Sequence, residues 1–191
     1  MRAPGSVGYT AVTVTVALNG LQQLLEECQG WGGIMASAAP PHDGGLQARS
    51  AGAKVLMVCT ANICRSPVAA ALWQARVPTH PADSAGVEAL PGLPPDPLCV
   101  DLMAERGIDL TGHRARRFHA RLAHAYDLIF VMEARHRERV CTLVPALRGR
   151  VHLLGRWTDQ AIADPHRRPR PYYQQCVISI EAAVEAWRAR L

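Results

Sequence analysis

Cys59 and Arg65 are the two residues whose types and spacing most directly predict chemistry, because five residues separate them and Ser66-Pro67 follow. A deprotonated cysteine is a nucleophile, and an arginine guanidinium can bind two oxygens of one phosphate group. Amide groups of the intervening loop and the N-terminus of a following helix also attract anions. Such surroundings lower the pKa of a cysteine from ~8.5 into the range ~3.5–7.5. The spacing therefore predicts a loop that binds a phosphate dianion above a thiolate.

The segments on either side of this loop are expected to be a strand and a helix. Residues 55–58 form a short apolar run, which is typical of a buried parallel strand. Pro67 precedes an apolar stretch, and proline favours the first turn of a helix. Cys59 would then lie at the carboxyl end of a strand, where parallel α/β sheets bind ligands. A buried cysteine in a Rossmann-like turn is the alternative.

Residues 54–67 resemble the active-site loop of the low-molecular-weight protein-tyrosine phosphatases, whose signature is cysteine, five residues, arginine, then serine or threonine. The resemblance implies that Cys59 forms a cysteinyl-phosphate intermediate and that Arg65 holds the phosphate oxygens. It implies that the other loop residues bind the substrate phosphate, namely Thr60, Ala61, Asn62, Ile63, Cys64 and Ser66.

The likeness extends across residues 54–191, with matching segments at 83–86, 112–116 and 126–132. It implies a supporting hydrogen-bond network that fixes the loop, formed by Asn62, Ser66, Ser84 and His113. For His113, a purely structural histidine is the competing interpretation. Cys64 has two interpretations of equal weight, a reversible disulfide with Cys59 or a small packing residue.

Hydrolysis of a tyrosine phosphate also needs a proton donor, because the phenol leaving group has a pKa near ~10. Asp96 and Asp164 each precede a proline, and chemistry alone does not choose between them. The resemblance implies Asp164, because the family's general acid lies in an Asp-Pro pair just before the C-terminal helix. The family often has an aromatic residue directly after this pair. His166 follows here instead, which leaves stacking against the substrate ring open.

Strands and helices alternate from residue 54 onward. Strands are expected at 54–58, 81–86, 126–132 and 151–154, and helices at 67–76, 96–106, 118–124, 133–143 and 172–190. The alternation predicts one α/β domain over 54–191 with a four-stranded parallel sheet flanked by helices, and the resemblance implies a flavodoxin-like topology. Residues 1–53 hold nine of the 15 glycines and lack periodicity, so they are expected to be a flexible extension, at most weakly helical over 19–28.

Composition limits the compartment and the partners. A thiolate nucleophile needs a reducing environment and the six cysteines show no disulfide spacing, so the cytoplasm is predicted. No run of residues approaches the ~18–20 apolar positions of a membrane span. The formal net charge of +5 suits an acidic phosphopeptide or a nucleic acid. The basic runs at 135–139 and 166–170 lack an aromatic platform, so no nucleic-acid partner is expected.

The predicted function is hydrolysis of phosphotyrosine in a protein, with no cofactor. No metal is expected either, because no His, Cys or Asp set has ligand spacing. Residues 140–157 look most like the bacterial branch that accompanies capsule and exopolysaccharide tyrosine kinases, so such a kinase is the expected partner. One alternative is an arsenate reductase of the same fold, which needs two further relay cysteines where only Cys141 is found. A non-enzymatic phosphate-binding module is the other.

Overall fold

The computed structural model describes residues 52–158 and 161–191. The predicted N-terminal extension lies outside the described residues except for positions 52 and 53, and so does the weak helix expected at 19–28. Within the described ranges, no helix combines the length and the apolar character that a membrane span requires.

Four parallel strands form the central sheet, as predicted. They are β1 (Val55–Cys59), β2 (Ala82–Gly86), β3 (Leu128–Val131) and β4 (Val151–Leu153), in the order β2-β1-β3-β4. β1 pairs with β2 on one side and with β3 on the other, and Cys59 lies opposite Gly86 in the register. The nucleophile predicted from sequence therefore ends a strand that is hydrogen-bonded along both edges.

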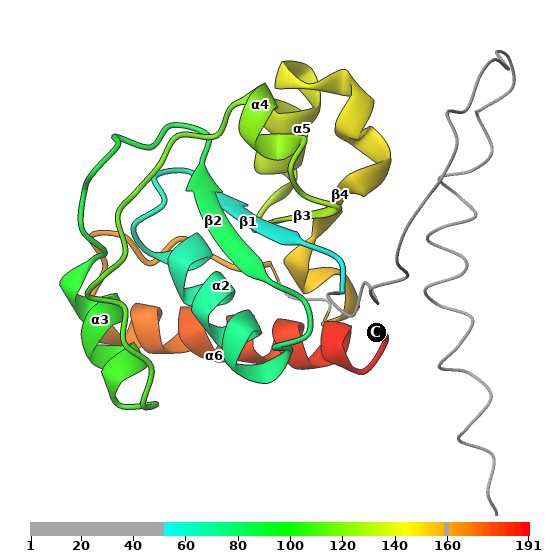
Figure 1. Ribbon diagram of the computed structural model, residues 1–191. Helices are drawn as coiled ribbons and strands as arrows, with labels where there is room; N and C mark the ends of the chain where they lie inside the picture. Colours follow the sequence, from blue (N-terminus) through cyan, green and yellow to red (C-terminus); the bar gives the residue numbers. More distant parts are fainter. Residues whose placement is uncertain (1–51, 159–160) are drawn as a thin grey trace, which may run out of the picture.

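Helices cover both faces of the sheet (Figure 1). α2 (Arg65–Arg76), α3 (Pro97–Ala104) and α6 (Arg170–Arg188) lie on one face, and α4 (Ala120–Ala123) and α5 (Ala134–Leu143) lie on the other. Alternate side chains of β1 enter the two cores, because successive side chains of a strand point to opposite faces. Val55 and Met57 pack in the core with α2 and α6, and Leu56 and Val58 pack in the core with α5.

Aromatic side chains join α2, β3 and α6 in the first core. The Phe130 ring centroid lies 5.3 Å from that of Trp73 and 4.6 Å from that of Trp187. Each indole N–H donates to a backbone oxygen, at 3.1 Å for Trp73 and 2.8 Å for Trp187. Buried indoles need such a partner. These contacts fix α2, and with it the loop that precedes α2, against the sheet.

Some element boundaries differ from those predicted. α2 begins at Arg65, two residues before Pro67; proline is compatible with this position because the first four N–H groups of a helix have no intrahelical acceptor. Two 3₁₀ helices, η1 (Pro145–Arg150) and η2 (Leu154–Trp157), flank β4 and were not predicted. Short turns of this kind carry no apolar period long enough to recognise in a sequence.

Candidate active site

Residues 59–65 form the phosphate loop, which connects β1 to α2. The Cys59 sulfur lies 3.0 Å from the Ser66 hydroxyl and accepts the Asn62 N–H at 3.3 Å. Its side chain is buried at the carboxyl end of the central strand. Both polar neighbours are placed to stabilise a negative charge on sulfur.

Asn62 holds the loop in shape from its centre. Its φ of 59° is left-handed, a conformation in which asparagine is several-fold enriched among non-glycine residues. Its side-chain amide donates to Ser66 at 2.9 Å and to Ser84 at 2.8 Å, and its side-chain oxygen accepts the Arg116 N–H. The His113 ring N–H donates to the Asn62 carbonyl at 2.8 Å. The four residues expected to form a supporting network thus all make contacts through Asn62.

Gly86 allows β2 to end directly beneath the phosphate loop. A Cβ atom at this position would lie 2.5 Å from the Thr60 carbonyl oxygen and 2.8 Å from the Asn62 nitrogen. Such distances are shorter than real Cβ contacts, and both neighbours are backbone atoms that cannot move away independently. Glycine is therefore required here by the close approach of two backbones.

Arg65 directs its buried guanidinium toward two carboxylates. Its Nη1 donates to Glu133 and, at 3.3 Å, to the Ile162 carbonyl. Its Nη2 donates to the Asp164 carboxylate at 2.6 Å. The guanidinium therefore joins the phosphate loop to the segment after β3 and to the loop that carries Asp164. That second loop, residues 161–169, is called the acid loop below.

The two candidate acids occupy different environments. The Asp164 side chain is 39% exposed, contacts Arg65 and accepts the His166 N–H at 3.2 Å. Asp96 instead accepts the Leu98 N–H at 3.0 Å as the N-cap of α3 and the Tyr173 hydroxyl at 2.8 Å. Asp96 already has a structural role, whereas Asp164 is bonded to the Arg65 guanidinium of the phosphate loop. The geometry therefore favours Asp164 as the proton donor.

The pKa of Cys59 departs from the expectation of a lowered value. Burial raises the pKa of the thiol, while the Ser66 hydrogen bond and the Arg65 charge act in the opposite direction. Burial is the larger effect, so these contacts limit the rise in the pKa of Cys59 without reversing it. The loop supplies the predicted stabilising groups, but the cost of desolvating the thiolate outweighs them in this arrangement.

Two site residues were missed by sequence reasoning, Glu133 and His136. Burial opposes ionisation of Glu133, but hydrogen bonds from Arg135 and Arg65 prevail and lower its pKa to about 2. The His136 ring lies 2.8 Å from the Thr60 hydroxyl, and burial lowers its pKa to about 4. Glu133 follows β3 at the sheet edge where Cys59 ends β1, so parallel topology was a signal that could have found it.

A cavity of about 370 Å³ opens beside the acid loop. Its lining includes Asp164, Pro165, Tyr172 and Cys176. The Tyr172 side chain is half exposed, and the Arg168 guanidinium lies over its ring at 4.3 Å from the centroid. Tyr173, in contrast, is buried and donates its hydroxyl to Asp96. Tyr172 is thus the aromatic side chain available beside Asp164, from a position later in sequence than the family's usual one.

The chain matches a model of a known protein family. The model described as low molecular weight phosphotyrosine protein phosphatase matches residues 54–191. The chain belongs to this family. Membership confirms the predicted enzyme class, a protein-tyrosine phosphatase.

Relatives and solved structures agree with this assignment. This phosphatase is 41% identical over 138 residues to the low molecular weight protein-tyrosine-phosphatase Wzb of Escherichia coli K12, covering 72% of this chain and 94% of Wzb. It is 39% identical to the probable phosphatase EpsP of Ralstonia nicotianae, covering 72% of this chain and 94% of EpsP. The structure of Vibrio vulnificus Wzb in complex with benzylphosphonate superposes with a TM-score of 0.71 at 33% identity, covering 73% and 99% of the two chains.

Proposed function

We propose that this phosphatase hydrolyses phosphotyrosine in proteins through a phosphorylated Cys59. The observation that carries the proposal is the contact between Arg65 and Asp164, because it brings the proposed acid to the loop that contains the thiol. Thiolate, anion-binding loop and carboxylic acid are the groups that this reaction needs.

The first half of the reaction transfers the phosphoryl group to sulfur. The Cys59 thiolate attacks phosphorus, the bond from phosphorus to the phenol oxygen breaks, and Asp164 delivers a proton to that oxygen. Arg65 and the loop amides stabilise the charge on the equatorial oxygens. Ser66 stabilises the thiolate through its 3.0 Å contact with sulfur.

The second half releases phosphate. Asp164, now ionised, accepts a proton from the water that attacks the phosphocysteine. The phosphorus–sulfur bond breaks, and the thiolate is regenerated as inorganic phosphate departs. One carboxyl group therefore acts as acid and then as base, and no cofactor is consumed.

A test compares the wild type with Cys59→Ser on phosphotyrosine and phosphoserine peptides, with arsenate reduction measured alongside. We expect hydrolysis of phosphotyrosine only, none by Cys59→Ser, and a phosphorylated peptide containing Cys59 in acid-quenched wild type. Turnover by Cys59→Ser would contradict the covalent route. Arsenate reduction faster than ester hydrolysis would favour the reductase.

The protein substrate that fits best is a bacterial tyrosine kinase of exopolysaccharide production, in the cytoplasm. The resemblance of residues 140–157 to that branch supports this, as do the relatives Wzb and EpsP. Exposed arginines of the acid loop, such as Arg167, would attract an acidic phosphopeptide. The test is dephosphorylation of such a kinase from the same organism at a higher kcat/KM than an unrelated phosphotyrosine protein; equal rates would contradict it.

A further inference from the structure

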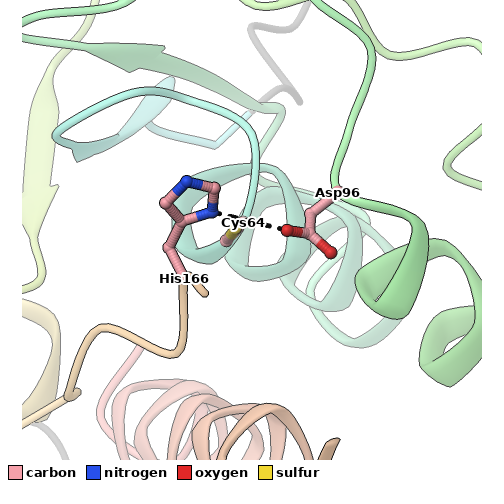
Figure 2. A group of neighbouring side chains, drawn as sticks. All are labelled: Cys64, Asp96 and His166. Atoms are coloured by element: carbon pink, nitrogen blue, oxygen red, sulfur yellow. Dashed lines mark ion pairs between the residues drawn. The ribbon is translucent and has the colours of Figure 1, made fainter. Parts of the chain in front are cut away.

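Cys64, Asp96 and His166 lie together at the rim of the active site. The sulfur, a carboxylate oxygen and a ring nitrogen all lie within 4.8 Å of one another. Figure 2 shows the imidazole and the carboxylate directed toward each other across the thiol. The residues come from the phosphate loop, the N-cap of α3 and the acid loop, so their separation in sequence hid the cluster.

The three donor types are those that zinc uses in proteins. Zn²⁺ is bound by cysteine sulfur, histidine nitrogen and carboxylate oxygen, whereas Mg²⁺ and Ca²⁺ select oxygen donors. A set of three protein ligands leaves one position of a tetrahedral ion for water. The mixed set is therefore suited to a borderline transition metal.

Neighbouring groups already orient one of the three donors, the Asp96 carboxylate. Asp96 is held by the Leu98 N–H and by the Tyr173 hydroxyl, which donates to Oδ2 at 2.8 Å. The His166 Nδ1 lies 3.5 Å from the same Asp96 Oδ2. Hydrogen bonds to a ligating carboxylate, such as those from Leu98 and Tyr173 to Asp96, are a regular feature of metal sites. The Cys64 thiol is buried, whereas the His166 side chain is 43% exposed, so solvent reaches one of the three donors.

We propose that Cys64, Asp96 and His166 form a binding site for Zn²⁺. The ion displaces the thiol proton, which passes to solvent, and takes its ligands from three segments that are distant in sequence. This site is separate from the proposed nucleophile, because Cys59 is not among its ligands.

The position of the site determines the effect of the metal on turnover. Cys64 directly precedes Arg65, and the His166 N–H bonds to Asp164. A bound ion ties the acid loop to the phosphate loop in the arrangement where Asp164 contacts Arg65, and so slows the exchange of that carboxylate for substrate phosphate. This inhibition rests on the proposed roles of Arg65 and Asp164, whereas metal binding does not.

The binding test uses the full chain with Cys59→Ser, which removes the reactive thiol as a competing ligand. Zn²⁺ is titrated by calorimetry at neutral pH, and Co²⁺ is titrated by absorption, where a thiolate-to-cobalt charge-transfer band reports sulfur ligation. We expect this band in Cys59→Ser and its loss in Cys59→Ser/Cys64→Ala. His166→Tyr, at an exposed position, should also abolish tight binding. Tyr173→Phe should weaken it by ~10–100-fold through loss of orientation of Asp96.

Cys141→Ala is the matched control, since Cys141 is another buried thiol, on α5 in the opposite core. The double variant Cys59→Ser/Cys141→Ala should bind Zn²⁺ as the Cys59→Ser parent does. The proposal is overturned if no charge-transfer band forms, if the band survives Cys64→Ala, or if tight binding survives His166→Tyr. Inhibition is measured on enzymes that retain Cys59. Zn²⁺ should slow turnover by the wild type and should slow His166→Tyr at least ~10-fold less. Equal inhibition of both would overturn the link between metal binding and turnover, even where the binding data support the site.

Discussion

The Arg65 guanidinium donates to the Asp164 carboxylate at 2.6 Å, so the group proposed to hold phosphate is paired with the group proposed to protonate the leaving group. An incoming phosphate must displace that carboxylate, because both are anions that bind the same Nη2 group. Substrate binding and release of the acid from Arg65 are therefore the same event.

Asp164→Asn tests this relationship in two ways. We expect kcat for phenyl phosphate to fall by ~10²–10⁴-fold, the usual contribution of a general acid, and the loss to be much smaller for an aryl phosphate with an acidic phenol. Inorganic phosphate should inhibit the variant more strongly, because a neutral amide competes less for Arg65. Asp101→Asn, at an exposed position on α3, is the control. Equal losses on both substrates would show that Asp164 only shapes the acid loop.

Glu133→Gln tests the second carboxylate on Arg65. Glu133 also accepts the Arg135 Nε–H at 2.8 Å, so the substitution removes the charge that holds two guanidinium groups. We expect kcat/KM to fall by up to ~10²-fold, as small displacements of a binding group can produce. Glu138→Gln, an exposed residue on α5, the helix that begins directly after Glu133, is the control for charge alone. A loss no greater than that of the control would contradict a positioning role.

Asn62→Ala and Asn62→Gly separate the two roles of Asn62. Both remove the buried hydrogen bonds to Ser66 and Ser84, at ~1–3 kcal/mol for each group left unpaired. Only alanine also meets the penalty of the left-handed conformation, ~1–2 kcal/mol. At ~2–4 °C of Tm per kcal/mol, Asn62→Ala should melt several degrees below Asn62→Gly, and both below wild type. Calorimetry measures this order; equal melting of the two variants would mean that the loop conformation relaxes.

His136 predicts a dependence of stability on pH. Its pKa is about 4 in the folded protein, against ~6.5 in an unfolded chain, so the unfolded state binds more protons between these values. Stability from this group is complete above pH ~6.5 and is lost as the pH falls toward ~4. His136→Gln can still bond to Thr60 but does not titrate. Its Tm should therefore fall less steeply with acidification than that of wild type or of exposed His124→Gln; parallel curves would contradict the assignment.

The sequence was most informative where the site is contiguous. Cys59 through Ser66 could be assigned because strand, loop and helix follow one another, and their local patterns agree. Glu133 and His136 were missed because they contact the loop across 68 and 76 positions of sequence. The raised pKa of Cys59 was missed because it comes from burial of the thiol, which depends on packing by distant segments. No pattern near Cys64 indicated the proximity of Asp96 and His166, which only the tertiary fold creates.

The two proposed catalytic partners lie in parts of the molecule with unequal resistance to local opening. Cys59 ends a buried strand that is hydrogen-bonded on both sides, and such amides exchange with solvent only when a whole domain opens. Asp164 lies in an irregular loop with part of its side chain in solvent. We therefore expect a rise in temperature to displace Asp164, the proposed acid, before it disturbs Cys59. On the proposed mechanism, we expect the warmed enzyme to lose proton donation while Cys59 can still be phosphorylated by substrates whose leaving groups need no proton.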